Sequence, residues 1–218
     1  MKKISTSQWV ALGAGGIAAA TTFILAASAQ GADTPVKTST NTETAVFAGG
    51  CFWCVESDFD QVDGVLATVS GYAGGDVDNP TYKQVTYGNT GHLESVQVTY
   101  DPAKVSYEDL VDHFFRTIDP TDPAGQFCDK GPSYRTAVFV KSDEQKQIVE
   151  QEIEDIDASG ALPKPVVTMV LQADKFWPAE DYHQNYYKTN PVRYRHYRVG
   201  CGRDAKLESL WGDEAITH

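Results

Sequence analysis

Two kinds of hydrophobic pattern divide the chain from Thr44 onward into predicted strands and helices. Apolar runs and alternating apolar positions predict strands over residues 44–48, 65–71, 93–100, 135–140 and 166–171. Apolar residues three or four positions apart predict helices over 51–59, over 106–118 with Ser106 as N-cap, and after the capping-box pattern Ser142-Asp143-Glu144-Gln145. From Phe176 onward the periodicity is weak, so we expect irregular structure there.

The order of these elements indicates the fold class. Strand, helix, strand, strand, helix, strand, helix, strand is typical of a two-layer α+β domain. We expect a two-layer α/β sandwich of the ferredoxin-like plait type, with a mainly antiparallel sheet and an irregular C-terminal wrap. The chain has 218 residues, 41% hydrophobic and 22% charged, which suffices for one substantial core. Residues 44–218 are therefore predicted to form a single domain.

The N-terminus has the layout of a secretory signal peptide. Lys2 and Lys3 precede an uncharged apolar stretch, Trp9 to Ala27, which ends in the small-residue pattern Ala27-Ser28-Ala29. Residues 1–29 are predicted to be this signal peptide and residues 30–43 a flexible leader. In a bacterium this predicts a periplasmic protein without stable membrane insertion after cleavage. An uncleaved membrane anchor is the alternative, because the apolar stretch is nearly long enough to span a bilayer.

The charge balance narrows the range of partners. The chain carries 18 basic and 30 acidic residues, a formal net charge of -12. A general nucleic-acid binder needs a basic surface, so the composition argues against this class. We expect a well-solvated acidic surface and a monomer.

Four cysteines, too few for a disulfide scaffold, include a Cys-x-x-Cys pattern at a predicted helix start, Cys51 and Cys54. There, free backbone N–H groups and the helix dipole are expected to lower a thiol pKa. The preceding glycines, 49 and 50, would let a substrate approach the backbone. Phe52 and Trp53 form an apolar wall suited to a methyl or thioether group. A structural cysteine, a thiol-disulfide oxidoreductase, a metal site and a nucleophile with its resolving partner all remain open.

Further motifs resemble those of a known family. Gly49-Gly50-Cys51-Phe52-Trp53 with Glu56 is similar to the signature of the A-type peptide-methionine (S)-S-oxide reductases, the methionine sulfoxide reductase A family. The resemblance covers roughly residues 44–200 and continues, in the family's order, through these blocks: Gly71-Tyr72-Ala73-Gly74-Gly75, Asn79-Pro80-Thr81-Tyr82, Thr90-Gly91-His92-Leu93-Glu94, Phe114-Phe115, Asp119-Pro120-Thr121, Gly131-Pro132-Ser133-Tyr134-Arg135 and Ala179-Glu180-Asp181-Tyr182-His183-Gln184.

This resemblance implies an enzyme that reduces methionine (S)-sulfoxide, in proteins and as the free amino acid, and so repairs oxidised proteins. It implies that Cys51 attacks the sulfoxide sulfur and that Glu94 protonates the sulfoxide oxygen. Such an acid must stay protonated near neutral pH, which burial achieves. It also implies that Tyr82 and Tyr134 donate hydrogen bonds to the same oxygen.

The resemblance assigns the substrate pocket as well. Phe52 and Trp53 would receive the methyl group of the substrate, which favours one sulfoxide epimer. Asp129 would help to hold the substrate. No metal and no organic cofactor is implied; the expected partners are oxidised proteins or peptides and a thioredoxin-like reductant.

The resolving cysteine stays open at this point. Catalysis would leave Cys51 as a sulfenic acid, which a second thiol converts to a disulfide. Cys54 stands where glycine is usual in the family, Cys128 stands where asparagine is expected, and Cys201 lies in a glycine-flanked C-terminal segment. Local geometry favours Cys54, mobility favours Cys201, and Cys128 would line the pocket. The competing functions are a periplasmic thiol-disulfide oxidoreductase using Cys51 and Cys54, and a metal-binding module of cysteines and histidines.

Overall fold

A computed structural model describes residues 41–217 of the chain. The predicted signal peptide and nearly all of the predicted leader lie outside these residues. Within the described part, no helix is both long enough and apolar enough to cross a membrane.

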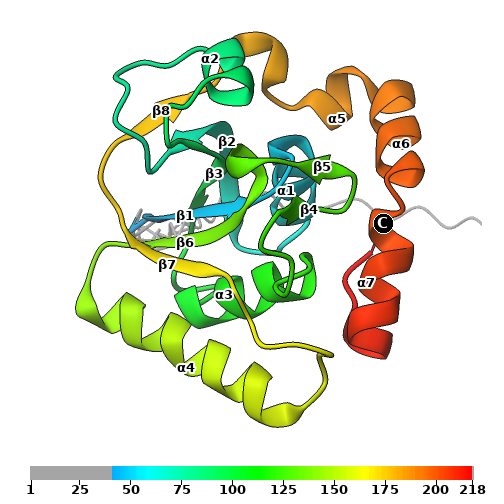
Figure 1. Ribbon diagram of the computed structural model, residues 1–218. Helices are drawn as coiled ribbons and strands as arrows, with labels where there is room; N and C mark the ends of the chain where they lie inside the picture. The colour runs from blue at the N-terminus through cyan, green and yellow to red at the C-terminus, as the bar shows by residue number, and fades with distance from the viewer. Residues whose placement is uncertain (1–40, 218) are drawn as a thin grey trace, which may run out of the picture. The chain divides into compact units, whose positions relative to one another are not determined.

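A six-stranded sheet forms the centre of the described domain (Figure 1). Its strands, β1 (Glu43–Gly49), β2 (Val65–Ala73), β3 (Leu93–Tyr100), β6 (Thr136–Val140), β7 (Met169–Gln172) and β8 (Phe176–Pro178), lie in the order β7-β6-β1-β3-β2-β8. All neighbouring strands are antiparallel except β6 and β7. A separate hairpin pairs β4 (Gly125–Gln126) with β5 (Asp129–Lys130). The prediction of a mixed α/β domain with a mainly antiparallel sheet is confirmed.

Helices cover one face of the sheet because its strands alternate apolar residues between two faces. On β1, Phe47 belongs to the large core beneath α1 (Phe52–Phe59), α3 (Tyr107–Arg116) and α4 (Asp143–Ser159), whereas Val46 belongs to a smaller cluster on the other face. Capping boxes at Thr81 and Ser106 open α2 (Tyr82–Tyr87) and α3, and the Ser142 side chain caps α4. The helices α1, α2 and α3 adjoin the ends of β1, β2 and β3, and several of the sequence blocks that resemble the family lie at those ends.

The prediction of an irregular C-terminal wrap from Phe176 onward is wrong. The segment contains three helices, α5 (Tyr186–Thr189), α6 (Pro191–Gly200) and α7 (Arg203–Trp211), along one side of the domain in Figure 1. Their buried residues include Tyr194 and Arg198 on α6 and Arg203 on α7. A pattern based on apolar residues misses a helix whose buried face is built from tyrosine and arginine. Short 3-10 turns, η1 (Pro132–Tyr134), η2 (Asp181–His183) and η3 (Gly212–Glu214), complete the chain.

Candidate active site

Cys51 occupies the N-cap of α1, two residues after β1 ends at Gly49, as the sequence predicted. The preceding Gly50 has φ +85°, a left-handed conformation that favours glycine. A Cβ on Gly50 would lie 2.5 Å from Cβ of Gln126 on the β4–β5 hairpin. The expectation that this glycine opens the backbone to substrate is therefore corrected: the absent side chain makes room for the hairpin.

Glu94 projects from β3 toward the start of α1. Its position alternates in phase with Val96 and Val98, so it lies on the sheet face that the helices cover. The backbone N–H of Phe52, the first residue of α1, donates a 3.0 Å hydrogen bond to Oε2 of Glu94. Glu94 is only 2% exposed, and burial raises its pKa to about 8. A protonated carboxyl at neutral pH thus lies beside the cysteine.

Cys51 and Cys54 are free, buried thiols in contact with each other. Burial is the largest cause that raises the pKa of Cys51, and the interaction with Cys54 is the next. The hydrogen bond that Cys51 donates lowers the pKa of Cys54. The expectation of a low pKa at Cys51 is wrong. Cys51 is enclosed beside another thiol and the Glu94 carboxyl, and this environment outweighs the benefit of the helix start. Cys51 therefore rests as a thiol, and Cys54 is the thiol that ionises more readily.

Phe52 and Trp53 form an aromatic wall next to Cys51. The Trp53 indole N–H donates to Nδ1 of His183 at 3.1 Å, and its ring stacks on Tyr186 at 3.8 Å between centroids. The ring of Phe52 packs 5.0 Å from His183 and 6.2 Å from Tyr82. Each ring is thus held by more than one neighbour, which fixes an apolar surface of defined shape beside the thiol.

Tyr82 and Tyr134 come together over Glu94 from two separate segments, the start of α2 and the end of η1. Both side chains are partly buried, and the Tyr134 hydroxyl acts as a hydrogen-bond donor toward Glu94 and toward the Tyr82 oxygen. Burial raises the pKa of both phenols, so their hydroxyls remain donors. The Tyr82 segment is held by Glu180, which accepts from the Tyr82 backbone N–H at 3.0 Å.

Asp129 joins the site through a residue that the sequence had not identified. The hydroxyl of Tyr197 on α6 donates to Oδ2 of Asp129 on β5, and it is also in hydrogen-bonding contact with Cys51. The charge of Asp129 contributes to the raised pKa of Glu94. Helical spacing offered a signal for Tyr197, because Tyr194 and Cys201 stand three residues before it and four after it, on the same face.

A buried ionic cluster lies behind Cys54. Asp58 of α1 pairs with Arg198 at 2.7 Å and with Arg203 at 3.3 Å, and all three side chains are at most 4% exposed. After the hydrogen bond from Cys51, which is the largest cause, these arginines further lower the pKa of Cys54. The cluster ties α6 and α7 to the helix that carries both thiols.

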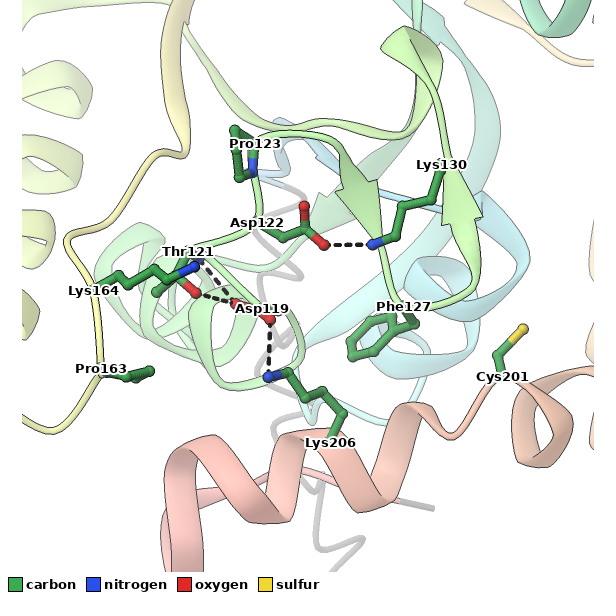
Figure 2. A pocket seen from close by; sticks show the side chains of 10 residues that line it. All are labelled: Asp119, Thr121, Asp122, Pro123, Phe127, Lys130, Pro163, Lys164, Cys201 and Lys206. Carbon is green, nitrogen blue, oxygen red and sulfur yellow. Dashed lines mark hydrogen bonds and ion pairs between the residues drawn. The ribbon is translucent and has the colours of Figure 1, made fainter.

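Cys128 and Cys201, both proposed as resolving candidates, form a disulfide. Cys128 is exposed and Cys201 partly buried. Cys201 also lies at the edge of a cavity of about 520 Å³ between α7 and the segment after α3, which Figure 2 shows. None of Cys51, Glu94, Phe52 and Trp53 lines this cavity.

Two neighbouring thiols, a neutral carboxyl and phenolic donors around an apolar wall define a thiol-dependent oxidoreductase. A family model described as peptide methionine sulfoxide reductase matches residues 43–215. The chain belongs to this family, which confirms the membership predicted from its motifs.

Relatives and solved structures support this assignment. The chain is 56% identical to "Peptide methionine sulfoxide reductase MsrA 2" of Rhizobium meliloti, over 78% of this chain and 84% of the relative. It is 53% identical to "Peptide methionine sulfoxide reductase MsrA/MsrB" of Vibrio cholerae over 84% of this chain, and it spans about half of that relative (48%). The structure of methionine sulfoxide reductase A of Corynebacterium diphtheriae aligns with a TM-score of 0.62 at 34% identity, over 70% of this chain and 77% of the other. Mxr1 of Saccharomyces cerevisiae in reduced form aligns with a TM-score of 0.63 at 32% identity, covering 69% and 86%.

Proposed function

We propose that this protein reduces methionine (S)-sulfoxide, in oxidised proteins and as the free amino acid, with Cys51 as nucleophile and Glu94 as proton donor. The observation that carries the proposal is the buried Glu94 carboxyl at the start of α1, next to Cys51, with a pKa of about 8. A carboxyl that is protonated at neutral pH is suited to protonate a leaving oxygen. The family match and the named relatives support the substrate class.

The first step transfers the oxygen atom from the substrate to the enzyme. The sulfur of Cys51 attacks the sulfoxide sulfur while Glu94 donates its proton to the oxygen, assisted by hydrogen bonds from Tyr82 and Tyr134. The oxygen, now a hydroxyl, passes from the substrate sulfur to the sulfur of Cys51 as the S–O bond of the substrate breaks. The bond between the two sulfur atoms formed in the attack breaks with its electron pair on the substrate sulfur, so methionine leaves as a thioether and Cys51 becomes a sulfenic acid. The proton that Cys51 gives up restores Glu94, so the step is balanced. The substrate methyl group packs against Phe52 and Trp53.

Cys54 then resolves the sulfenic acid. Its sulfur contacts Cys51, it is free, and its pKa is lowered, so it attacks Cys51, forms a disulfide and releases water. A thioredoxin-like protein dithiol returns both cysteines to thiols by disulfide exchange and is itself oxidised. Cys54 is favoured over Cys201 because the sulfur of Cys201 is bonded to Cys128.

Assays with the separated S and R epimers of methionine sulfoxide test this proposal. Wild type should form methionine from the S epimer only, and Cys51→Ser should form none. Glu94→Gln should retain the fold but lose most of the activity. If Glu94→Gln reduces disulfides normally and wild type fails on the S epimer, the protein is instead a thiol-disulfide oxidoreductase.

We also propose export to the periplasm as a monomer with residues 1–29 removed. The charged start, the apolar stretch and the small-residue pattern support it. Intact mass and size-exclusion chromatography of the protein from the periplasmic fraction of a bacterial host test both points. A protein that begins at Met1, or one that elutes as a dimer, would contradict the respective part.

A finer fold assignment follows from the strand order. We infer a ferredoxin-like plait made of β1, α1, β2, β3, α3 and β6. The order β6-β1-β3-β2 and its antiparallel pairs support it, with β7 and β8 added at the two edges.

A further inference from the structure

We propose that the Cys128–Cys201 disulfide is a positioning clamp for substrate binding: it holds the Tyr197–Asp129 pair over Cys51. Cys128 and Cys201 are then positioning residues that take no part in the electron transfer. This inference rests on the proposed function, because it assigns the two residues a role in binding the same sulfoxide.

The geometry joins the disulfide directly to that pair. Cys128 immediately precedes Asp129 on the hairpin, and Cys201 follows Tyr197 by four residues, one helical turn. The two sulfur atoms and a carboxylate oxygen of Asp129 all lie within 4.8 Å of one another. The disulfide therefore lies against the hydrogen bond between Tyr197 and Asp129. Within the described residues, the only other side-chain hydrogen bond of this pair is the Tyr197 contact with Cys51.

Besides the disulfide and the Tyr197–Asp129 hydrogen bond, the hairpin contacts the C-terminal helices through Phe127, whose ring lies 4.5 Å from the Arg203 guanidinium of α7. The β4–β5 hairpin has two residues in each strand. The helix α6 that meets it belongs to the C-terminal part of the chain, and Cys201 follows Cys128 by 73 residues. A two-stranded hairpin of this length has little stability of its own. Without the disulfide, the Tyr197–Asp129 hydrogen bond would have to hold the hairpin against α6, with the Phe127–Arg203 contact as the link to α7. The substrate would then have to order Asp129 and Tyr197 as it binds.

The same observations separate a clamp from a relay. A relay needs a thiol at Cys128 or Cys201 to attack a Cys51–Cys54 disulfide, whereas it is Tyr197, bonded to the neighbouring Asp129, that interacts with Cys51. Cys54 already contacts Cys51 and needs no intermediary. The disulfide is, however, open to solvent at Cys128 and from the cavity in Figure 2, so a strong reductant can reach it and release the clamp.

The test compares wild type with the double variant Cys128→Ser/Cys201→Ser, and with Val199→Ser as a matched control on an exposed position of α6. Steady-state kinetics with methionine (S)-sulfoxide use a thioredoxin-like protein dithiol in place of a strong small-molecule reductant, and thiol titration checks that the wild-type Cys128–Cys201 disulfide stays oxidised. They should give a KM raised about tenfold in the double variant, with kcat changed less than about twofold, because the reacting groups are intact but less well ordered. Val199→Ser should match wild type. Circular dichroism at the assay temperature ensures that each variant is folded.

Two further measurements distinguish positioning from a general structural effect. Tyr197→Phe should raise KM in wild type, but should add less than half of that effect to the double variant, because the disulfide and the hydroxyl act as a unit. Fully reduced wild type, freed of reductant, should release one methionine per enzyme, as should the double variant.

Other outcomes overturn the clamp. An unchanged KM in the double variant, or fully additive effects of Tyr197→Phe, would show that the disulfide does not position the pair. Two methionines per reduced wild-type enzyme, against one for the double variant, would establish a relay instead. Failure of wild type on the S epimer would reject the proposed function itself, a result distinct from all of these.

Discussion

Replacing Glu94 by glutamine tests whether the central carboxyl is neutral, independently of any assay of catalysis. Glutamine keeps the size of the side chain and an acceptor for the Phe52 N–H, but it cannot ionise. In the folded protein the pKa of Glu94 is about 8, against about 4.3 in an unfolded chain. Between these values the folded state holds a proton that the unfolded state has lost. Wild type must therefore lose stability as the pH rises through this interval, and Glu94→Gln must not lose it through this group.

The size of the effect follows from the two pKa values. Between about pH 5 and about pH 8, linkage gives a loss of about 3.5 kcal/mol in the free energy of unfolding contributed by Glu94. Urea unfolding of wild type and Glu94→Gln at both pH values, with the disulfide kept oxidised, measures it. Other titrating groups are common to both proteins and cancel in the difference. If the gap between the two proteins is the same at both pH values, Glu94 is ionised at neutral pH and cannot be the proton donor.

Three further predictions concern the cysteines and the buried ion pairs. Cys54→Ser should release one methionine per enzyme in a single turnover but should not recycle with a protein dithiol; normal recycling would rule out Cys54 as the resolving residue. Arg198→Met should cost about 3 kcal/mol in unfolding free energy, because it removes one partner of the buried Asp58. It should also slow disulfide formation after the oxygen transfer, measured by quenched thiol titration; an unchanged rate would show that the ionic cluster does not influence the reactivity of Cys54. Cys128→Ser/Cys201→Ser should lose about 4 kcal/mol, because the disulfide spans 73 residues; chemical unfolding with an unchanged midpoint would contradict this.

The sequence predicted most of the sheet because its strands follow simple rules. The predicted strand 93–100 coincides with β3, and Ser106 caps α3 as expected, since both follow from local patterns of apolar and capping residues. The C-terminal helices were missed because tyrosine and arginine occupy their buried positions. Arg198 is buried there because two carboxylates neutralise it: Asp58, on a helix more than a hundred residues earlier, and Asp204 on α7.

The candidate site shows the same division. The position of Cys51 at a strand-to-helix junction was predictable from residues 49–54 alone, because a Gly-Gly turn before a helix has a local physical meaning. The proposed role of Cys51 as nucleophile came from the family resemblance. Glu94 was identified by family resemblance, although its phase in β3 already placed an acidic residue on a core face. The role of Tyr197 was not predicted at all, because it depends on a hydrogen bond to a residue 68 positions away.

By itself, the sequence determined the central strands, the three main helices, the position of Cys51 and the family to which the chain belongs. Only the tertiary structure decided which thiols are partners and which way their pKa values move. Four cysteines can pair in several ways, and the choice depends on which backbone segments meet: Cys128 meets Cys201 where the hairpin touches α6, and Cys54 remains free beside Cys51. The pKa values depend on burial and on charges from distant segments, and local sequence carries no record of either.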